Sequence, residues 1–252
     1  MKSIAKRALS APFRLLPVFA RRRLVHAVVT AASSRPPADA LRELLGFDDV
    51  VTGATNEVAL VYGGGVHVKH RLMQYHDFFV SRIRPGERVL DVGCGYGAVA
   101  HSIATRADAR VTGLDMDHDN VARARARFGS AHLQFVEGVA PQDVPDEVFD
   151  VVVASNVLEH VEHRQEFLQR IQRRTRARRW LIRVPMADRD WRVPLRAELG
   201  LFAFSDPTHF TEYTRESFDA EMAAAGFEVR HLQVNWGEIW AEVALRASPN
   251  GS

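Results

Sequence analysis

The residues best suited to chemistry form a glycine-rich segment preceded by an acid. Gly93, Gly95 and Gly97 follow the apolar run 89–92, and Asp91 stands two residues before the first glycine. Glycines let the backbone turn sharply and let a ligand approach it closely, and a helix that starts there offers free N–H groups. We interpret this spacing as a nucleotide-type cofactor site; a strand-to-helix turn without a ligand is the alternative.

Two classes of cofactor fit the glycine segment. Its first two glycines and Ala98 match the G-x-G-x-x-G/A pattern of dinucleotide-binding folds, and Asp115 suits a ribose diol with either cofactor. Three features favour S-adenosylmethionine. Gly97 supplies a third glycine, Asp91 would bind an ammonium group but repel a pyrophosphate, and the chain ends in an antiparallel strand foreign to the usual dinucleotide fold.

Two histidines follow strands expected at the ligand-binding edge of a sheet. His160 comes shortly after the strand expected at 149–154, and His209 lies in the long irregular stretch 185–213 that follows the next strand. Histidine is the favoured base near neutral pH, and loops of this length are usually functional. We take His209 and His160 as candidate catalytic residues, with a structural or solvent-exposed histidine as the alternative for each.

Alternating strand and helix patterns predict an α/β fold. Strands are expected at 88–92, 110–114, 132–136, 149–154, 180–184, 227–234 and 239–246. Helices are expected at 39–47, 69–83, 98–106, 120–128, 161–174 and 215–225. This alternation predicts a doubly wound, Rossmann-like and mainly parallel sheet with helices on both faces. The turn before the last strand is too short for a parallel connection, so that strand is expected to be antiparallel.

Charge is unevenly distributed along the chain. The 252 residues hold 33 basic and 31 acidic side chains, but residues 1–38 hold eight basic side chains and no acidic one. This charge favours a polyanionic or membrane-surface partner for the N-terminal arm. A composition of 46% apolar and 25% charged residues is typical of a globular protein. A single cysteine, Cys94, excludes an internal disulfide framework, and no apolar run approaches the ~20 residues of a membrane-spanning helix.

The pattern divides the chain into three predicted parts. Residues 1–37 form a basic amphipathic arm that ends at a proline pair, residues 38–84 form a helical cap segment, and residues 85–246 form the cofactor-binding domain. Within that domain, 185–213 is expected to be a substrate lid. The basic, amphipathic character of the arm predicts a cytoplasmic protein that binds peripherally to an anionic membrane. Its arginine-rich composition also fits an organelle transit peptide, which is the alternative.

Four segments, in order, resemble a known family. They are VLDVGCGYG at 89–97, GLDMD at 113–117, FDVVVASNVLEHV at 149–161 and HFTEYTRESFDAEMAAAGFEV at 209–229. Together they look like a class I S-adenosylmethionine-dependent methyltransferase, closest to the group that acts on small molecules, lipids and sugars. The resemblance covers about residues 70–246. It implies a seven-stranded sheet with a reversed last strand, which agrees with the strands expected above.

The resemblance also implies a set of cofactor-binding residues. They are Asp91, Gly93, Gly95, Gly97, Asp115, Met116, Ala140 and Asn156. The glycine segment should line the methionine end of the cofactor, while Asp115 binds the ribose hydroxyls and Met116 packs on adenine. The family usually carries an acid near the adenine amino group, but this chain has Val139 there, which leaves backbone groups near Ala140 to read the adenine edge. Asn156 should face the cofactor, and capping of the next helix is the alternative.

These observations predict transfer of a methyl group from S-adenosylmethionine to a hydroxyl of a sugar, a lipid-linked glycan or a related metabolite. The reaction is expected to be a direct SN2 transfer with a histidine general base, because a sulfonium methyl needs only an aligned acceptor and removal of a proton. Two other functions stay open. One is a non-catalytic S-adenosylmethionine-binding protein, which the departure at Val139 allows, and the other is a nicotinamide-dependent oxidoreductase.

Nucleic acids and metal ions are not expected as ligands. The segment 155–158 lacks the Asn/Asp-Pro-Pro-aromatic element that base-modifying methyltransferases use to stack a flipped base. His67 and His70, like His160 and His163, are spaced i,i+3, but the sequence shows no carboxylate cluster around either pair.

Overall fold

The computed structural model describes residues 13–246, which divide into two compact units. Within the described range, the smaller unit comprises residues 13–67 and 196–202, and the larger unit comprises 68–195 and 203–246. Residues 1–12 of the predicted basic arm lie outside the described range. None of the described helices combines the length and the apolar character needed to cross a membrane.

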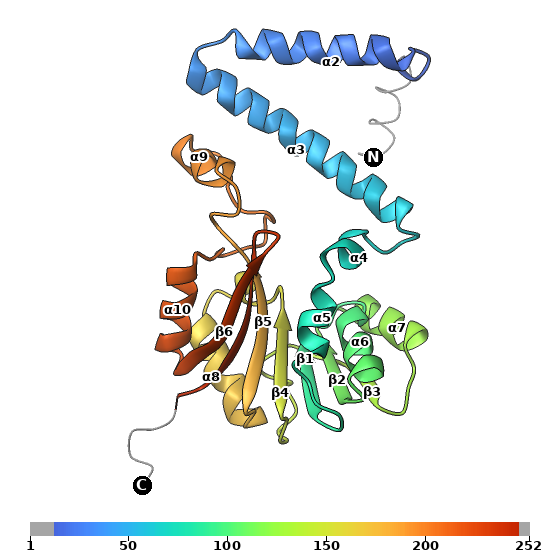
Figure 1. The fold of residues 1–252 in the computed structure, drawn as a ribbon, viewed down its shortest axis with the longest axis vertical. Coiled ribbons are helices and arrows are strands. Elements are labelled where there is room, and N and C mark those ends of the chain that lie inside the picture. Colours follow the sequence, from blue (N-terminus) through green and yellow to red (C-terminus); the bar gives the residue numbers. More distant parts are fainter. Residues whose placement is uncertain (1–12, 247–252) are drawn as a thin grey trace. The chain divides into compact units, whose positions relative to one another are not determined.

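Two long helices form most of the smaller unit (Figure 1). They are α2 (Val18–Ser33) and α3 (Pro37–Tyr62). A proline at the start of α3 is tolerated because the N–H that it lacks would have no partner within the helix. The expectation of a short helix at 39–47 is wrong, since α3 continues over 26 residues. Residues 48–62 contain no proline, and the single Gly53 costs a helix only about 1 kcal/mol.

The segment 196–202 is held to α3 by side-chain hydrogen bonds. Arg196 pairs with Asp49 at 2.7 Å, and Arg42 donates to the backbone carbonyl of Leu199 at 3.2 Å. Part of the stretch expected to be a lid therefore belongs to the smaller unit.

The larger unit is built on one seven-stranded sheet. Its strands are β1 (Arg88–Val92), β2 (Arg110–Asp115), β3 (Leu133–Glu137), β4 (Val151–Ser155), β5 (Arg179–Pro185), β6 (Phe227–Asn235) and β7 (Glu238–Leu245). They lie in the order β3-β2-β1-β4-β5-β7-β6; the first five are parallel, and β7 is antiparallel to both of its neighbours. The predicted Rossmann-like sheet with a reversed last strand is confirmed. The order reverses between β1 and β4, which is where α/β sheets bind ligands.

Helices cover both faces of this sheet (Figure 1). On one face lie α5 (Tyr75–Val80), α6 (Ala98–Arg106) and α7 (His118–Arg127). On the other lie α8 (Arg164–Thr175) and α10 (Arg215–Ala224). The short elements are α4 (Lys69–Met73), the 3₁₀ helix η1 (Leu158–His160) and α9 (Arg192–Glu198). A hydrophobic core lies on each face of the sheet. Because side chains alternate along a strand, neighbouring residues such as Val89 and Leu90 of β1 pack into different cores.

Three expectations about helices in this part of the chain are wrong. The single helix expected at 69–83 is broken into α4 and α5 at Gln74, whose φ of 52° is left-handed and cannot continue a right-handed helix. The helix expected at 161–174 begins only at Arg164, because η1 forms first and the chain then extends. The stretch 185–213, expected to be irregular, contains α9.

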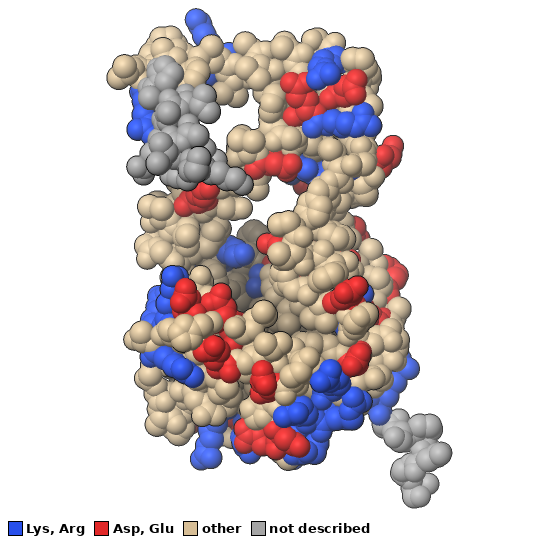
Figure 2. Space-filling model, turned by 180° about the vertical axis from the view of Figure 1, so that it is seen from behind, with Lys and Arg blue, Asp and Glu red and all other residues tan. Residues whose placement is uncertain are grey.

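Surface charges of the larger unit pair locally. On the face shown in Figure 2, basic and acidic side chains lie next to one another. Arg176 pairs with Asp146 at 2.9 Å, for example, and Arg106 with Asp77 at 2.6 Å. Exposed pairs of this kind contribute about 0–1 kcal/mol each. The stability of the unit therefore depends mainly on the two cores beside the sheet.

Trp180 tests this dependence. It is fully buried on β5, and its Nε1 donates to Oε1 of Gln172 at 2.7 Å. Trp180→Ala leaves a cavity and an acceptor without its donor, so we expect the free energy of unfolding to fall by about 3–5 kcal/mol in a denaturant titration. Trp191→Ala is the matched control: Trp191 is 70% exposed, and its loss should change stability by less than about 0.5 kcal/mol. Equal losses in the two variants would contradict this account.

Candidate functional site

The glycine segment joins β1 to α6 in a conformation that requires glycine. Gly93, Gly95 and Gly97 have φ values of 65°, 52° and 76°, in the left-handed region that other residues rarely adopt. A Cβ on Gly97 would lie 2.5 Å from Cζ of Phe135, whereas a Cβ on Gly95 would meet no described atom within 4 Å. Packing therefore constrains Gly97, and the backbone at Gly95 is left open to a ligand.

Asp115 ties the glycine segment to the end of β2. Its Oδ2 accepts a hydrogen bond from the Gly95 N–H at 2.7 Å, and its Oδ1 accepts from the Asp117 N–H at 3.0 Å. Asp117 in turn caps α7 by accepting from the Asn120 N–H at 2.9 Å. The acid expected to bind ribose thus also fixes the loop beside it.

A cavity of about 570 Å³ lies at the carboxyl ends of β1, β2 and β4. Its lining includes six of the predicted cofactor-binding and catalytic residues: Gly93, Asp115, Met116, Ala140, Asn156 and His160. Asp91, Gly95, Gly97 and His209 are not among the lining residues. The side chain of Met116 is 73% exposed, so it does not belong to the core and offers an apolar surface at the cavity. Its contact with adenine stays a prediction.

Two buried oxygens near the cavity lack hydrogen-bond partners among the described residues: Oδ2 of Asp91 and Oδ1 of Asn156. Burial, together with the charge of Asp115, raises the pKa of Asp91 to about 8. The side chain of Asn156 does not cap η1, the role weighed as the alternative for it. Buried acceptors need donors, and the ammonium and hydroxyl groups of S-adenosylmethionine are such donors. The residues present therefore fit this cofactor.

The segment after β3 has Val139 at the position where the family usually has an acid. The side chain of Val139 is 46% exposed and offers no acceptor. Its N–H donates to Oδ2 of Asp143 at 2.8 Å, and a Cβ on Gly138 would lie 2.7 Å from the Cβ of Asp143. An acid absent at position 139 is thus present four residues later, turned toward the backbone. The sequence pattern did not predict a role for Asp143.

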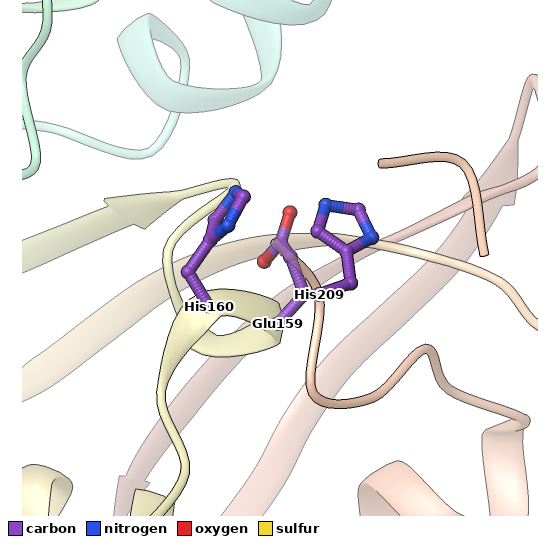
Figure 3. A group of neighbouring side chains, drawn as sticks. All are labelled: Glu159, His160 and His209. Carbon is purple, nitrogen blue, oxygen red and sulfur yellow. The ribbon is translucent and has the colours of Figure 1, made fainter. Parts of the chain in front are cut away.

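The structure brings the two candidate histidines together. The ring centroids of His160, in η1, and His209, in the segment before α10, are 4.6 Å apart with the planes at 76°. Figure 3 shows the Glu159 carboxylate between the two imidazoles. One ligand-type atom from each of the three side chains lies within 4.8 Å of the others. The backbone bond from the Phe210 N–H to the Glu159 carbonyl, at 2.8 Å, joins the two segments.

Each imidazole is oriented through its Nδ1 atom. Nδ1 of His209 lies 3.0 Å from Oε1 of Glu212, and Nδ1 of His160 lies 2.9 Å from the Thr208 hydroxyl. Burial alone would raise the pKa of Glu212, but hydrogen bonds from Ser205 and Arg189 lower it below its usual value. Burial and the neighbouring His209 lower the pKa of His160. These pKa shifts favour a neutral His160 and an ionised Glu212, the partner of His209.

Glu159 is the member of this group that the sequence analysis did not single out. It is fully buried, and neither of its carboxylate oxygens has a hydrogen-bond partner among the described residues. Burial raises the pKa of Glu159 to about 8. Its position beside a candidate histidine was visible in the sequence. Its burial was not, since this depends on the segment that carries His209. Glu212 was equally visible as a carboxylate three residues after His209.

Substitutions at Gly95 and Gly97 distinguish a role of the loop in stability from a role in cofactor binding. Gly95→Ala and Gly97→Ala impose similar backbone strain, about 1–2 kcal/mol in the left-handed region. Only the methyl group at position 97 collides with Phe135. We expect Gly97→Ala to lower the melting temperature clearly more than Gly95→Ala does. Gly95→Ala should instead lower the affinity for S-adenosylhomocysteine in calorimetry. Unchanged affinity in Gly95→Ala would show that the ligand does not approach this backbone.

Comparison with known proteins agrees with this geometry. A family model described as a methyltransferase domain matches residues 66–232. The ribosomal protein L11 methyltransferase of Burkholderia mallei is 37% identical over 38% of this chain and 31% of its own length. The fatty-acid O-methyltransferase of Mycolicibacterium smegmatis is 40% identical over 34% and 32%, and the ubiquinone biosynthesis O-methyltransferase of Aliivibrio fischeri is 42% identical over 30% and 34%. The chain thus spans about a third of the length of these relatives.

The fold has solved counterparts as well. An S-adenosylmethionine-dependent methyltransferase from Aquifex aeolicus matches with a TM-score of 0.56 and 15% identity, over 71% of this chain and 93% of that one. At this identity the likeness concerns the fold. The family model, in contrast, covers well over half of the chain. This chain therefore belongs to the class I S-adenosylmethionine-dependent methyltransferase family, with S-adenosylmethionine as its cofactor.

Proposed function

We propose that this protein methylates a hydroxyl oxygen of a sugar, a lipid-linked glycan or a related metabolite, with a histidine as general base. The observation that carries the proposal is the His160–His209 pair, with ring centroids 4.6 Å apart at the edge of the cofactor cavity. Because His160 itself lines the cavity, an acceptor bound beside it lies next to the cofactor site.

Positioning is the larger part of this chemistry. S-adenosylmethionine supplies a methyl group already activated by a positively charged sulfur, so the chain has to align the acceptor and take its proton. Alignment contributes on the order of 7–11 kcal/mol, and a positioned base roughly 10²–10⁴-fold in rate. The cavity lining from β4 to α8 is suited to the first task, and the histidine pair to the second.

His209 has the better-supported geometry for a base. An Nδ1–H that donates to Glu212 leaves the lone pair of Nε2 available to accept a proton. The ionised Glu212 also stabilises the imidazolium that forms, as the third member of a nucleophile–base–acid triad does. His160 has a hydroxyl rather than a carboxylate on its Nδ1, and it lies nearer the cavity.

An exposed aromatic side chain next to His209 favours an acceptor with apolar parts. Phe210 is 55% exposed, and its N–H donates to the Glu159 carbonyl. Tyr213, the last residue of the segment expected to be a lid, is buried and donates to Glu221 at 2.6 Å. The names of two relatives refer to a fatty acid and to ubiquinone biosynthesis, and that of a third to a ribosomal protein. A protein acceptor is thus the competing class.

His209→Ala tests the base. We expect turnover to fall by about 10²–10⁴-fold, while the affinity for S-adenosylhomocysteine changes by less than about twofold, the signature of an interaction used in the transition state. Turnover is measured with methyl-labelled cofactor and host extract separated into lipid, aqueous and protein fractions.

The matched control is His132→Ala, which removes an exposed histidine in the turn just before β3. It should leave turnover unchanged. Unchanged turnover in His209→Ala would remove that residue as the base. Label found only in the protein fraction would contradict a small-molecule acceptor.

The N-terminal arm supports a second element of the proposal, reversible attachment to an anionic membrane surface from the cytoplasm. In its described part, three consecutive arginines, 21–23, are exposed on α2. Phe19, Leu24 and Val25 are exposed beside them, at 65%, 46% and 63%. Basic and apolar side chains combined in this way bind the headgroup region of anionic bilayers.

Vesicle sedimentation tests the arm. Each basic residue near an anionic surface contributes about 1 kcal/mol, so we expect the triple variant Arg21→Gln, Arg22→Gln, Arg23→Gln to bind anionic vesicles at least tenfold more weakly. The control changes three exposed arginines of the larger unit, Arg173, Arg176 and Arg178, to glutamine and should bind as the unchanged protein does. Equal recovery of the unchanged protein with neutral and anionic vesicles would overturn the attachment.

A further inference from the structure

Glu159 presents an electrostatic problem that the protein alone does not solve. Its side chain is fully buried, and both carboxylate oxygens lack hydrogen-bond partners among the described residues. A buried carboxylate is costly unless a donor or a cation compensates it. The basic group whose charge acts on it is Arg183, and this guanidinium is already held by Glu238 through two hydrogen bonds. The carboxylate is therefore left for a ligand.

We propose that Glu159, His160 and His209 bind a divalent transition-metal ion. Two imidazole nitrogens and one carboxylate oxygen form the ligand set of many catalytic zinc and iron(II) sites. The three side chains converge on one region in Figure 3, and one ligand atom from each lies within 4.8 Å of the others. In the sequence, His160 pairs by spacing with His163, and no carboxylate cluster surrounds that pair; the structure groups His160 with Glu159 and His209 instead.

The outer hydrogen bonds suit this role. A metal-binding histidine usually donates its other N–H to a carboxylate or a similar acceptor, which fixes the ring and its tautomer. Here Nδ1 of His209 is held by Glu212 and Nδ1 of His160 by Thr208, and the Thr208 hydroxyl in turn donates to Asp206. These contacts leave Nε2 of each ring as the atom for the ion.

The ligand atoms have to move closer together to hold an ion. Donor atoms bound at about 2.0–2.1 Å around one zinc ion lie about 3–4 Å apart, against the 4.8 Å limit that holds here. The backbone bond from Phe210 to Glu159, at 2.8 Å, already holds the two ligand-bearing segments together.

Such an ion would keep the proposed methyl transfer, on which its role rests, but it would replace the histidine as the means of removing the acceptor proton. Three protein ligands leave an open position, and His160 places the ion at the cavity. An acceptor hydroxyl bound there would ionise more readily, so the imidazoles would act through the ion rather than as bases themselves. In the balanced step, the acceptor O–H bond breaks and its proton passes to water. The O–CH₃ bond forms, and the methyl–sulfur bond breaks with its electron pair left on sulfur.

The test uses cobalt(II) chloride and the untagged full-length protein after treatment with a chelator. Visible absorption of cobalt(II) reports nitrogen and oxygen coordination independently of catalysis, and zinc competition is followed by calorimetry. We expect saturation at one ion per chain. Glu159→Gln and His209→Gln should each weaken binding by at least about 100-fold, beyond the 10–100-fold cost of losing an outer partner.

A matched control exists on the surface of the same unit. Nδ1 of His118 lies 2.8 Å from Oε2 of Glu137, so His118→Gln and Glu137→Gln remove an imidazole–carboxylate pair outside the cluster. These variants should bind cobalt as the unchanged protein does. Equal melting temperatures and equal affinities for S-adenosylhomocysteine verify that the cluster variants are folded.

The outcomes separate this inference from the proposed function. Absence of saturable binding, or normal binding by Glu159→Gln and His209→Gln, would overturn the ion site. Full methyl transfer by the metal-free protein would overturn the catalytic role of the ion and leave the histidine base intact. Cobalt binding without methyl transfer to any extract fraction would support the site and count against the proposed function.

Discussion

Two buried carboxyl groups, Asp91 and Glu159, form no ion pair with any of the described residues and constrain the binding edge of this protein. They are 2% and 0% exposed, and burial is the main reason that the pKa of each is about 8. A carboxylate in apolar surroundings costs free energy unless donors or a cation offset the lost hydration. Each group therefore favours the binding of a hydrogen-bond donor or a cation. One such position lies beside the glycine segment, and the other lies between the two imidazoles.

Two buried or half-buried arginines of the larger unit, Arg183 and Arg189, are bound by other carboxylates. Arg183 is bound by Glu238 and lies 3.8 Å from the centre of the Tyr75 ring. Arg189 is bound by Glu212, the same carboxylate that orients His209. Arg183 thus neutralises Glu238, and Arg189 neutralises Glu212, so neither guanidinium neutralises Glu159. The carboxyl edge of the sheet thus concentrates acceptors where a cofactor with a positively charged sulfur and an ammonium group binds.

The sheet could be predicted from the sequence because its signals are local. Apolar runs bounded by glycine or proline mark strands, and the runs at 88–92 and 227–234 match β1 and β6 to within one residue. Helix ends were harder to predict. Gln74 adopts a left-handed conformation that no glycine announces, and α3 extends to Tyr62 because nothing after residue 47 stops it. In both cases the outcome depends on the difference in free energy between continuing the helix and ending it, and no sequence motif marks that difference.

The same distinction explains which parts of the site could be foreseen. The glycine spacing revealed the loop and its left-handed turns, although distant residues, Asp115 and Phe135, also hold it in place. The histidine cluster depends on a contact between η1 and the segment before α10, held by the bond from the Phe210 N–H to the Glu159 carbonyl. Neither segment specifies that contact by itself. Without it, Glu159 is a polar residue on a short turn, and with it the carboxylate is buried beside two imidazoles. Its chemistry is therefore a property of the long-range contact, which only the folded sheet creates.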